Sequence, residues 1–204
     1  MVVIGLCGSS GAGKGYVSNI FEKYGIPCID TDKLYREKTT KKGTACLDEL
    51  TKEFGNGILT EDGELNRTAL AAIVFEGEDA KDRLSRLNEI AHKYIKIDTK
   101  EILAENEANG KTATVIDAPV LFESGFDKMC DITVAVVAPY EKKLERIISR
   151  DKITKEKAEV RLKSQLSDNE LIKRTTYQID NSSIDVETQI IEILKKEQIY
   201  EKEC

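Results

Sequence analysis

The sequence predicts an α/β fold built on a parallel, five-stranded, doubly wound sheet. Three observations carry this prediction. Short apolar runs alternate with segments of helical periodicity, the first apolar run leads into a glycine-rich turn, and one helical stretch is too long for a single crossover. A chain of 204 residues can bury the hydrophobic core that such a sheet needs.

The first two strands flank the first helix. Residues 2–7 form an apolar run bounded by glycine, which is typical of a buried parallel strand. A helix is expected after the glycine-rich turn, and Gly25 with Pro27 ends it. Residues 27–30 are expected as the second strand. Apolar side chains at helical spacing define the buried face of this helix: Val17, Ile20, Phe21 and Tyr24.

The remaining elements divide the chain into three parts. Apolar runs predict strands at 113–116 and 132–137, a fifth strand is expected at 177–179, and a closing helix is expected at 184–197. Between them lie a long helical stretch, expected as an insertion on the substrate side of the sheet, and a second, charged helical excursion that Pro139 opens. The predicted parts are a core (about 1–32, 110–139 and 167–204), a helical insertion (about 33–109) and the excursion (about 140–166).

Composition excludes several functional classes. Hydrophobic residues make up 40% and charged residues 33% of the chain, so it is neither collagen-like, mucin-like nor disordered. A net charge of −6 argues against general binding to nucleic acid or anionic lipid. No apolar run approaches the roughly 20 residues that span a bilayer. We therefore expect a cytoplasmic protein with no nucleic-acid or membrane partner, either monomeric or a weak homo-oligomer.

The cysteines agree with this compartment. Their number is odd, their spacing is wide and no C-x-x-C occurs, so neither a disulfide framework nor a zinc site is indicated. The five are Cys7, Cys28, Cys46, Cys130 and Cys204.

The turn between the first strand and the first helix has the pattern G-x-x-x-x-G-K. Its glycines let successive backbone N–H groups face inward around an anion, and the helix that follows adds its positive dipole end. Lys14 supplies a charge for the β- and γ-phosphates of a nucleotide. The alternative is an ordinary glycine-rich turn with a surface lysine, which the strand and helix context disfavours. The predicted nucleotide contacts are Gly8, Gly11, Ala12, Gly13, Lys14, Gly15 and Tyr16.

One position departs from the usual motif. Gly15 and Tyr16 stand where a Ser or Thr hydroxyl normally reaches magnesium, and Ser18, a full turn further along, is a poor substitute. Mg²⁺ is therefore expected to rest on water, phosphate oxygens and carboxylates, which suits an ion that commonly keeps several waters.

Carboxylates follow two of the predicted strands. Ligands collect beyond the carboxyl ends of parallel strands, where Asp30, Asp32 and Asp117 fall. Phosphoryl transfer uses one carboxylate to accept the proton of the acceptor hydroxyl and others to organise magnesium. We predict Asp32 as this base and Asp117 as a group that holds Mg²⁺ through water. Spacing alone equally allows Thr31 or Asp32 to cap the next helix.

The excursion is a basic segment in an acidic chain. Residues 141–163 carry nine basic and five acidic side chains. Arg146 and Arg150 are four residues apart, so one helix face presents both. This pattern fits a lid that brings arginines onto the transferring phosphoryl group and excludes water. A solvated pair of charged helices is the ordinary meaning of such a run, and the loop motif favours the lid.

Several short motifs are together more specific than the loop alone. They are Ile4-Gly5-Leu6, Ile29-Asp30-Thr31-Asp32, Leu65-Asn66-Arg67, Asp117-Ala118-Pro119-Val120-Leu121-Phe122-Glu123, Arg146 with Arg150-Asp151, and Asp180-Asn181. With them the chain resembles the dephospho-coenzyme A kinase family, in the nucleoside-monophosphate-kinase branch of P-loop proteins. Two departures stand out, Gly15-Tyr16 in the loop and His92-Lys93 where the family has His-Pro.

The resemblance implies a P-loop kinase fold with a helical acceptor-binding insertion and a helical lid. It also implies ATP and Mg²⁺ as cofactors, and dephospho-coenzyme A as the small-molecule substrate that is phosphorylated on its ribose 3′-hydroxyl. On this basis Asp32 is the base, His92 contacts the acceptor, Asn181 lies near adenine, and Lys14, Arg146 and Arg150 stabilise the phosphoryl oxygens. Two alternatives stay open, a kinase of the same fold acting on another small molecule or a nucleoside monophosphate, and a non-catalytic ATP-binding relative.

Overall fold

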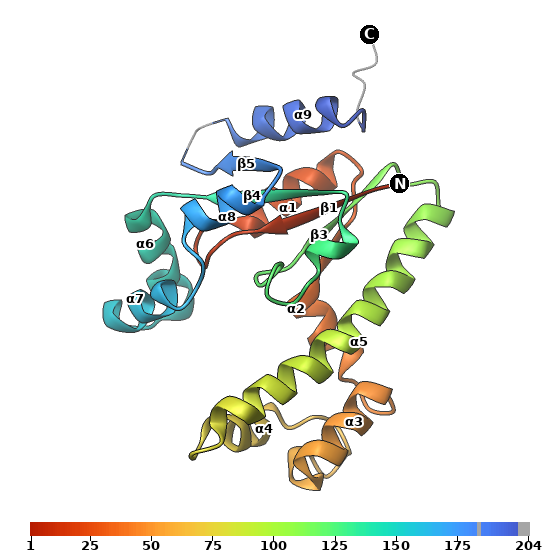
Figure 1. The fold of residues 1–204 in the computed structure, drawn as a ribbon, viewed down its shortest axis with the longest axis vertical. Coiled ribbons are helices and arrows are strands. Elements are labelled where there is room, and N and C mark those ends of the chain that lie inside the picture. Colours follow the sequence, from red (N-terminus) through yellow and green to blue (C-terminus); the bar gives the residue numbers. More distant parts are fainter. Residues whose placement is uncertain (183–184, 200–204) are drawn as a thin grey trace. The chain divides into compact units, whose positions relative to one another are not determined.

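The computed structural model describes residues 1–182 and 185–199. Its five strands form one sheet in the order β2-β3-β1-β4-β5, and the ladders that join β3, β1, β4 and β5 are parallel (Figure 1). The α/β fold class and the strand positions are therefore confirmed. The strands are β1 (Val2–Cys7), β2 (Cys28–Asp30), β3 (Ala113–Asp117), β4 (Ile132–Val137) and β5 (Tyr177–Asp180).

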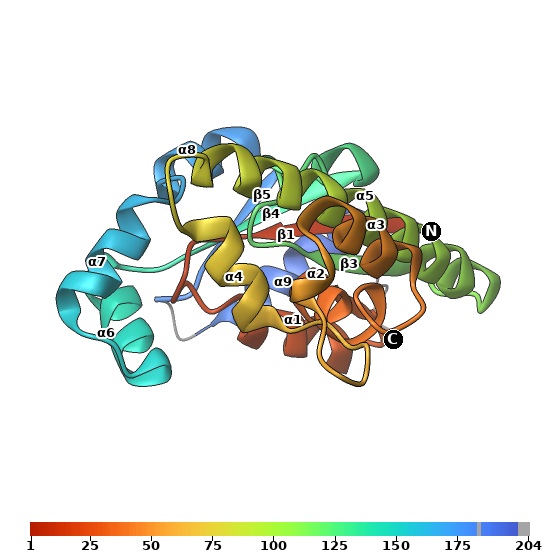
Figure 2. The same ribbon diagram turned by 90° about the horizontal axis from the view of Figure 1, so that it is seen from below.

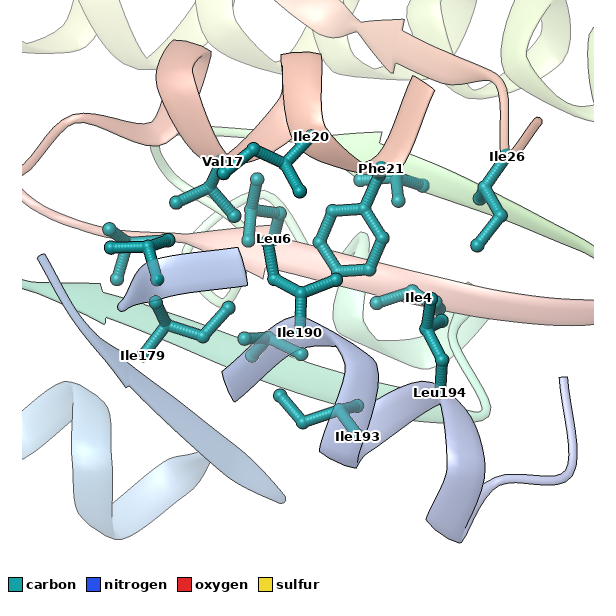
Figure 3. Packing of buried hydrophobic residues seen from close by; sticks show 14 of the residues in the cluster. Ile4, Leu6, Val17, Ile20, Phe21, Ile26, Ile179, Ile190, Ile193 and Leu194 are labelled. Carbon is teal, nitrogen blue, oxygen red and sulfur yellow. The ribbon is translucent and has the colours of Figure 1, made fainter. Parts of the chain in front are cut away.

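One face of the sheet is covered by α1 (Lys14–Lys23) and α9 (Val186–Lys196). Figure 3 shows side chains of both helices meeting Ile4 and Leu6 of β1, which point to the same side because strand side chains alternate. Phe21 and Ile190 are fully buried there. This packing fixes the start of α1, and with it the turn that precedes the helix. The helix predicted at 184–197 is confirmed from Val186, whereas position 184 and Cys204 lie outside the described residues.

The chain divides into two compact units, residues 1–29 with 105–204, and residues 30–104. The second unit is helical. It contains α2 (Thr31–Leu34), a π-helical turn η1 (Tyr35–Thr39), α3 (Ala45–Phe54), the 3₁₀ turn η2 (Asn56–Ile58), α4 (Arg67–Phe75) and most of α5 (Ala80–Ala108) (Figure 2). Its own apolar core is built from Cys46, Leu50, Ile58, Leu70, Val74 and Ile90.

The predicted excursion lies within the first unit. It forms α6 (Tyr140–Asp151) and α7 (Lys155–Lys163), which lie side by side in Figure 1 and Figure 2. A small cluster of Leu144, Ile147, Ala158 and Leu162 joins the two helices. Helix α8 (Asp168–Arg174) then leads back to β5, and the 3₁₀ turn η3 (Asp127–Met129) precedes β4. Across the described part of the chain, no helix has the length and apolar character needed to cross a membrane.

Candidate active site

The glycine-rich turn adopts a conformation that only glycine accommodates at two positions. Gly11 and Gly13 have φ angles of 77° and 97°, in the left-handed region. A Cβ on Gly11 would lie 2.5 Å from the carbonyl oxygen of Lys143, and one on Gly13 would collide with the amide of Asn181. Gly13 is also the N-cap of α1, so the turn delivers the unpaired N–H groups of a helix start to its own concave side.

Lys14 lies across this turn. Its Nζ donates to the carbonyl oxygen of Gly8 at 3.3 Å and lies 3.9 Å from Oδ1 of Asp117. Asp117 reaches this position because it ends β3 directly beside Leu6 of β1 in the parallel register. The structure therefore brings together the predicted phosphate-binding lysine and the predicted magnesium-organising carboxylate.

Ser18 joins the same group of side chains, although sequence reasoning set it aside. Its Oγ donates to Oδ2 of Asp117 at 3.2 Å, and the side chain is almost fully buried one turn into α1. No short-range spacing signals this contact, since 99 residues separate the two positions. The hydroxyl orients the carboxylate, which is a role that a turn further along the helix permits.

The donor set fits a hydrated magnesium ion. Asp117 and Ser18 offer hard oxygen ligands beside the lysine of the turn, and Mg²⁺ keeps several waters while it binds one or two carboxylates and substrate phosphates. Among the described residues no group of three or more His, Cys, Asp and Glu side chains gathers into a protein-only metal cage. The arrangement therefore suits an ion that arrives with nucleotide phosphates.

Gly15 and Tyr16 follow Lys14 in the first turn of α1, where neither is a Ser or Thr. A Cβ built on Gly15 would meet no atom within 4 Å, so the position opens onto free space. Tyr16 is 55% exposed, while its backbone N–H donates to the Gly13 carbonyl at 3.1 Å. The backbone of Tyr16 therefore takes part in the first turn of α1.

Two other predicted residues contact the second half of the turn. Nη1 of Arg146 donates to the carbonyl oxygens of Gly11 and Ala12 at 3.0 and 3.2 Å, and Nδ2 of Asn181 donates to that of Ala12 at 2.7 Å. Both side chains therefore satisfy backbone carbonyl oxygens in the second half of the turn.

Arg150 has a different environment from Arg146. Its guanidinium makes two hydrogen bonds to Asp151, at 2.7 and 2.9 Å, and Arg161 donates to the same carboxylate at 2.7 Å. Arg150 holds the pKa of Asp151 below its usual value, mainly through these hydrogen bonds. In the described conformation the two predicted lid arginines therefore contact different groups, Arg146 the turn and Arg150 the Asp151 carboxylate.

In the helical unit, Asp32 lies in the first turn of α2 and its side chain is exposed. The capping alternative is wrong for this residue and for Thr31, because Asp30 is the N-cap and accepts the backbone N–H of Lys33 at 2.8 Å. The carboxylate of Asp32 is therefore not needed to hold the helix start.

Sequence reasoning missed a local feature next to Asp32. The π-helical turn η1 is held by Arg67, whose Nη2 donates to Oγ1 of Thr40 at 2.9 Å and to the carbonyl oxygen of Arg36. The same guanidinium lies 5.4 Å from the ring centre of Tyr35, and burial raises the pKa of that phenol to about 12. The only signal in the sequence is the Leu65-Asn66-Arg67 motif, which does not reveal its partners.

His92 lies half-buried on α5. Burial, and then the charge of Lys96, lower the pKa of its imidazole below the usual 6.5. We expect NMR titration of this single histidine to give a midpoint below 6.5. As the pH falls, His92 is then protonated in the unfolded chain before it is protonated in the folded one. The contribution of His92 to the free energy of unfolding should therefore fall as the pH drops below about 6.5, and it should be absent above that pH. Replacing His92 with Gln should remove that part of the slope, and an unchanged slope would contradict the assignment.

Comparison with known proteins shows the family of this chain. The family model of dephospho-CoA kinases matches residues 2–187. A dephospho-CoA kinase of Fusobacterium nucleatum subsp. nucleatum is 39% identical over 183 residues, covering 90% of this chain and 91% of that protein. One of Listeria innocua serovar 6a is 38% identical over 182 residues and covers 88% of each chain. The solved structure of the dephospho-CoA kinase from Campylobacter jejuni superposes with a TM-score of 0.68 at 25% identity, covering 95% of this chain and 96% of that one. The chain belongs to the dephospho-CoA kinase family.

Proposed function

We propose that this kinase transfers the terminal phosphoryl group of ATP to the ribose 3′-hydroxyl of dephospho-coenzyme A, giving coenzyme A and ADP. The observation that carries the proposal is the convergence of Lys14, Asp117, Ser18 and Arg146 on one glycine-rich turn, in a chain that belongs to this family. The four described cysteines are free, and the reaction is assigned to the cytoplasm, where thiols stay reduced.

The turn of residues 8–16 binds the phosphates of ATP in this proposal. The N–H groups at the start of α1 offer donors, and Lys14 offers a positive charge that can move from the Gly8 carbonyl to phosphate oxygens. Asn181, which donates to the Ala12 carbonyl, is the residue proposed to lie near the base of the nucleotide. Bound Mg²⁺ would neutralise phosphate charge, with Asp117 holding it through water and Ser18 orienting Asp117.

Asp32 accepts the proton of the 3′-hydroxyl in the proposed mechanism. A carboxylate free of capping duty and exposed to solvent is available for this role. The helical insertion, about residues 33–109, binds dephospho-coenzyme A, and His92 on α5 is its proposed contact. Because burial keeps the imidazole neutral near pH 7, His92 acts as a hydrogen-bonding group and not as a cation.

The segment of about residues 140–166 acts as a lid. Arg146 is already at the turn, so a small shift of its guanidinium from the Gly11 and Ala12 carbonyls would bring it to phosphate oxygens. When the lid closes, Arg150 releases the Asp151 carboxylate and binds the transferring phosphoryl group. Cations brought to the phosphates in this way stabilise the charge that develops in phosphoryl transfer.

The test is product detection by mass spectrometry with ATP, Mg²⁺ and a panel of acceptors. We expect a mass gain of one phosphoryl group on dephospho-coenzyme A and a lower kcat/KM for every nucleoside monophosphate. Preference for a nucleoside monophosphate would overturn the acceptor assignment. Tight ATP binding without product on any acceptor would favour a non-catalytic nucleotide-binding protein.

Restoring a hydroxyl in the turn should strengthen magnesium binding. Serine fits at position 15, since a Cβ there meets nothing within 4 Å. We expect Gly15→Ser to lower the Mg²⁺ concentration that gives half-maximal nucleotide binding by about fivefold, because it adds one oxygen ligand. Calorimetric titration of ATP at several Mg²⁺ concentrations measures this.

Gly15→Ala is the matched control for that experiment. Both substitutions replace a glycine of α1 with a residue of higher helix propensity, a gain of about 1 kcal/mol at most, but only serine brings an oxygen. Equal Mg²⁺ dependence of the two variants would contradict the role proposed for the hydroxyl.

A further inference from the structure

A lysine is buried on the outer side of the glycine-rich turn. The Lys143 side chain, in the first turn of α6, is only 8% exposed. Its Nζ donates to Oδ1 of Asp168 at 2.8 Å and to Oγ of Ser9 at 3.1 Å, and Ser9 Oγ in turn lies 3.3 Å from the same carboxylate oxygen. The three side chains form a closed triangle of polar contacts with Ser9, a residue of the turn, at one corner.

Stability alone gives no reason for a charge at this place. Lysine is almost never fully buried unless it is paired, and a buried ion pair is often no more stabilising than apolar residues of the same volume. Breaking the pair on one side is costly because it leaves the other charge without compensation. The Lys143–Asp168 pair therefore has to be explained by what it positions.

The contacts of the pair point to the turn. Ser9 is 6% exposed and follows Gly8 directly. Its hydroxyl is therefore the group through which Lys143 and Asp168 contact the first half of the turn. The backbone of Lys143 also lies against Gly11, where a Cβ would come within 2.9 Å of the Lys143 Cα. One residue of α6 thus meets the turn through both its side chain and its main chain.

A second contact ties the turn to the far end of the lid. The backbone N–H of Ser10 donates to Oε1 of Gln165 at 2.8 Å, three residues before Asp168. Lys143 lies near the start of the segment 140–166, and Gln165 and Asp168 lie at or just after its end. Both ends of the segment are therefore fastened to the same pair of serines.

We propose that Ser9, Lys143 and Asp168 form a clamp that sets the shape of the phosphate-binding turn and couples it to both ends of the lid. Lys143 is then a positioning residue for nucleotide binding, since it acts through Ser9. A displacement of about 1 Å in such a group can cost a large factor in binding or rate. The proposal rests on the proposed function in two respects, that ATP binds on this turn and that residues 140–166 act as the lid.

The key variant removes both charges together. In Lys143→Met/Asp168→Leu the pair is replaced by apolar side chains of similar size, so the midpoint of thermal unfolding should stay near that of the unchanged protein. Ser9 loses both of its partners in this variant. We therefore expect the Kd for ATP, measured by calorimetry on the full chain without acceptor, to rise about tenfold. The KM for ATP should rise in parallel, with little change in kcat.

Other variants separate positioning from structure. Lys143→Met alone should lower the unfolding midpoint and weaken ATP binding, and Lys143→Arg should restore much of both because it can still donate to Asp168 and Ser9. Ser9→Ala keeps the ion pair and removes only the hydroxyl that contacts it. It should therefore weaken ATP binding without a large change in the midpoint of thermal unfolding. Lys142→Met, an exposed lysine one position away in α6, is the control and should bind ATP normally.

Two results overturn the clamp. One is a double variant that binds ATP within about twofold of the unchanged protein. The other is a Ser9→Ala variant whose affinity for ATP lies within the same twofold range. This second result decides the question if the double variant does not fold. Lys14→Ala measured alongside distinguishes this failure from failure of the proposed function. If Lys14→Ala loses ATP binding while the clamp variants keep it, the clamp is wrong and the nucleotide site stands. If Lys14→Ala also binds ATP normally, the nucleotide site itself is wrong.

Discussion

Asp32→Asn is expected to lower kcat by about 10²- to 10⁴-fold while the Kd for ATP stays close to normal. The substitution keeps the size and polarity of the side chain and removes the ability to accept a proton from the 3′-hydroxyl. Asp32 does not cap α2, so no loss of fold is expected to contribute. Steady-state kinetics with dephospho-coenzyme A, together with calorimetry of ATP binding, separates the two effects.

Asp30→Asn is the matched control for this prediction. It makes the same chemical change two residues earlier, at the N-cap of α2, where asparagine caps about as well as aspartate. The control should retain most of the activity. A fully active Asp32→Asn would remove Asp32 from the role of base, and equal losses in both variants would point to charge in this segment instead of proton transfer.

Lys14→Met is expected to weaken ATP binding by about 10- to 100-fold, the usual worth of a hydrogen bond to a charged group. The ammonium is the charged donor of the glycine-rich turn, and it lies 3.9 Å from Asp117. Calorimetry with and without Mg²⁺ measures the loss. Lys23→Met, at the exposed end of the same helix, should leave ATP affinity unchanged. An unchanged affinity for ATP in Lys14→Met would contradict the proposed phosphate site.

The sheet could be predicted because its information is local. Strands β1 and β4 are short apolar runs, and residues 2–7, for example, lead into a glycine-rich motif of fixed spacing. The same holds for the turn, since Gly11, Gly13 and Lys14 are close in sequence and their roles follow from backbone geometry. The excursion at 140–166 was recognisable from charge, but the boundary between α6 and α7 was not.

The contacts around the turn could not be predicted, because they join positions far apart in the chain. Ser9 and Lys143 are separated by 134 residues and Ser18 and Asp117 by 99. A serine and a buried lysine carry no pattern that reveals their partner, and lysine in a charged helix is most simply exposed. The capping alternative at Asp32 failed for a related reason, since Asp30 could cap equally well and spacing does not choose between them.

The shared carboxylate of Asp151 has a consequence for how the lid works. Arg150 and Arg161 both donate to it, and Arg150 is 58% exposed, so either bond is weak and readily exchanged. In the proposed mechanism Arg150 turns toward a phosphate, and Arg161 then remains as the counter-ion of Asp151. The segment would therefore hold a second guanidinium that preserves the charge balance at Asp151 while the first one binds the nucleotide.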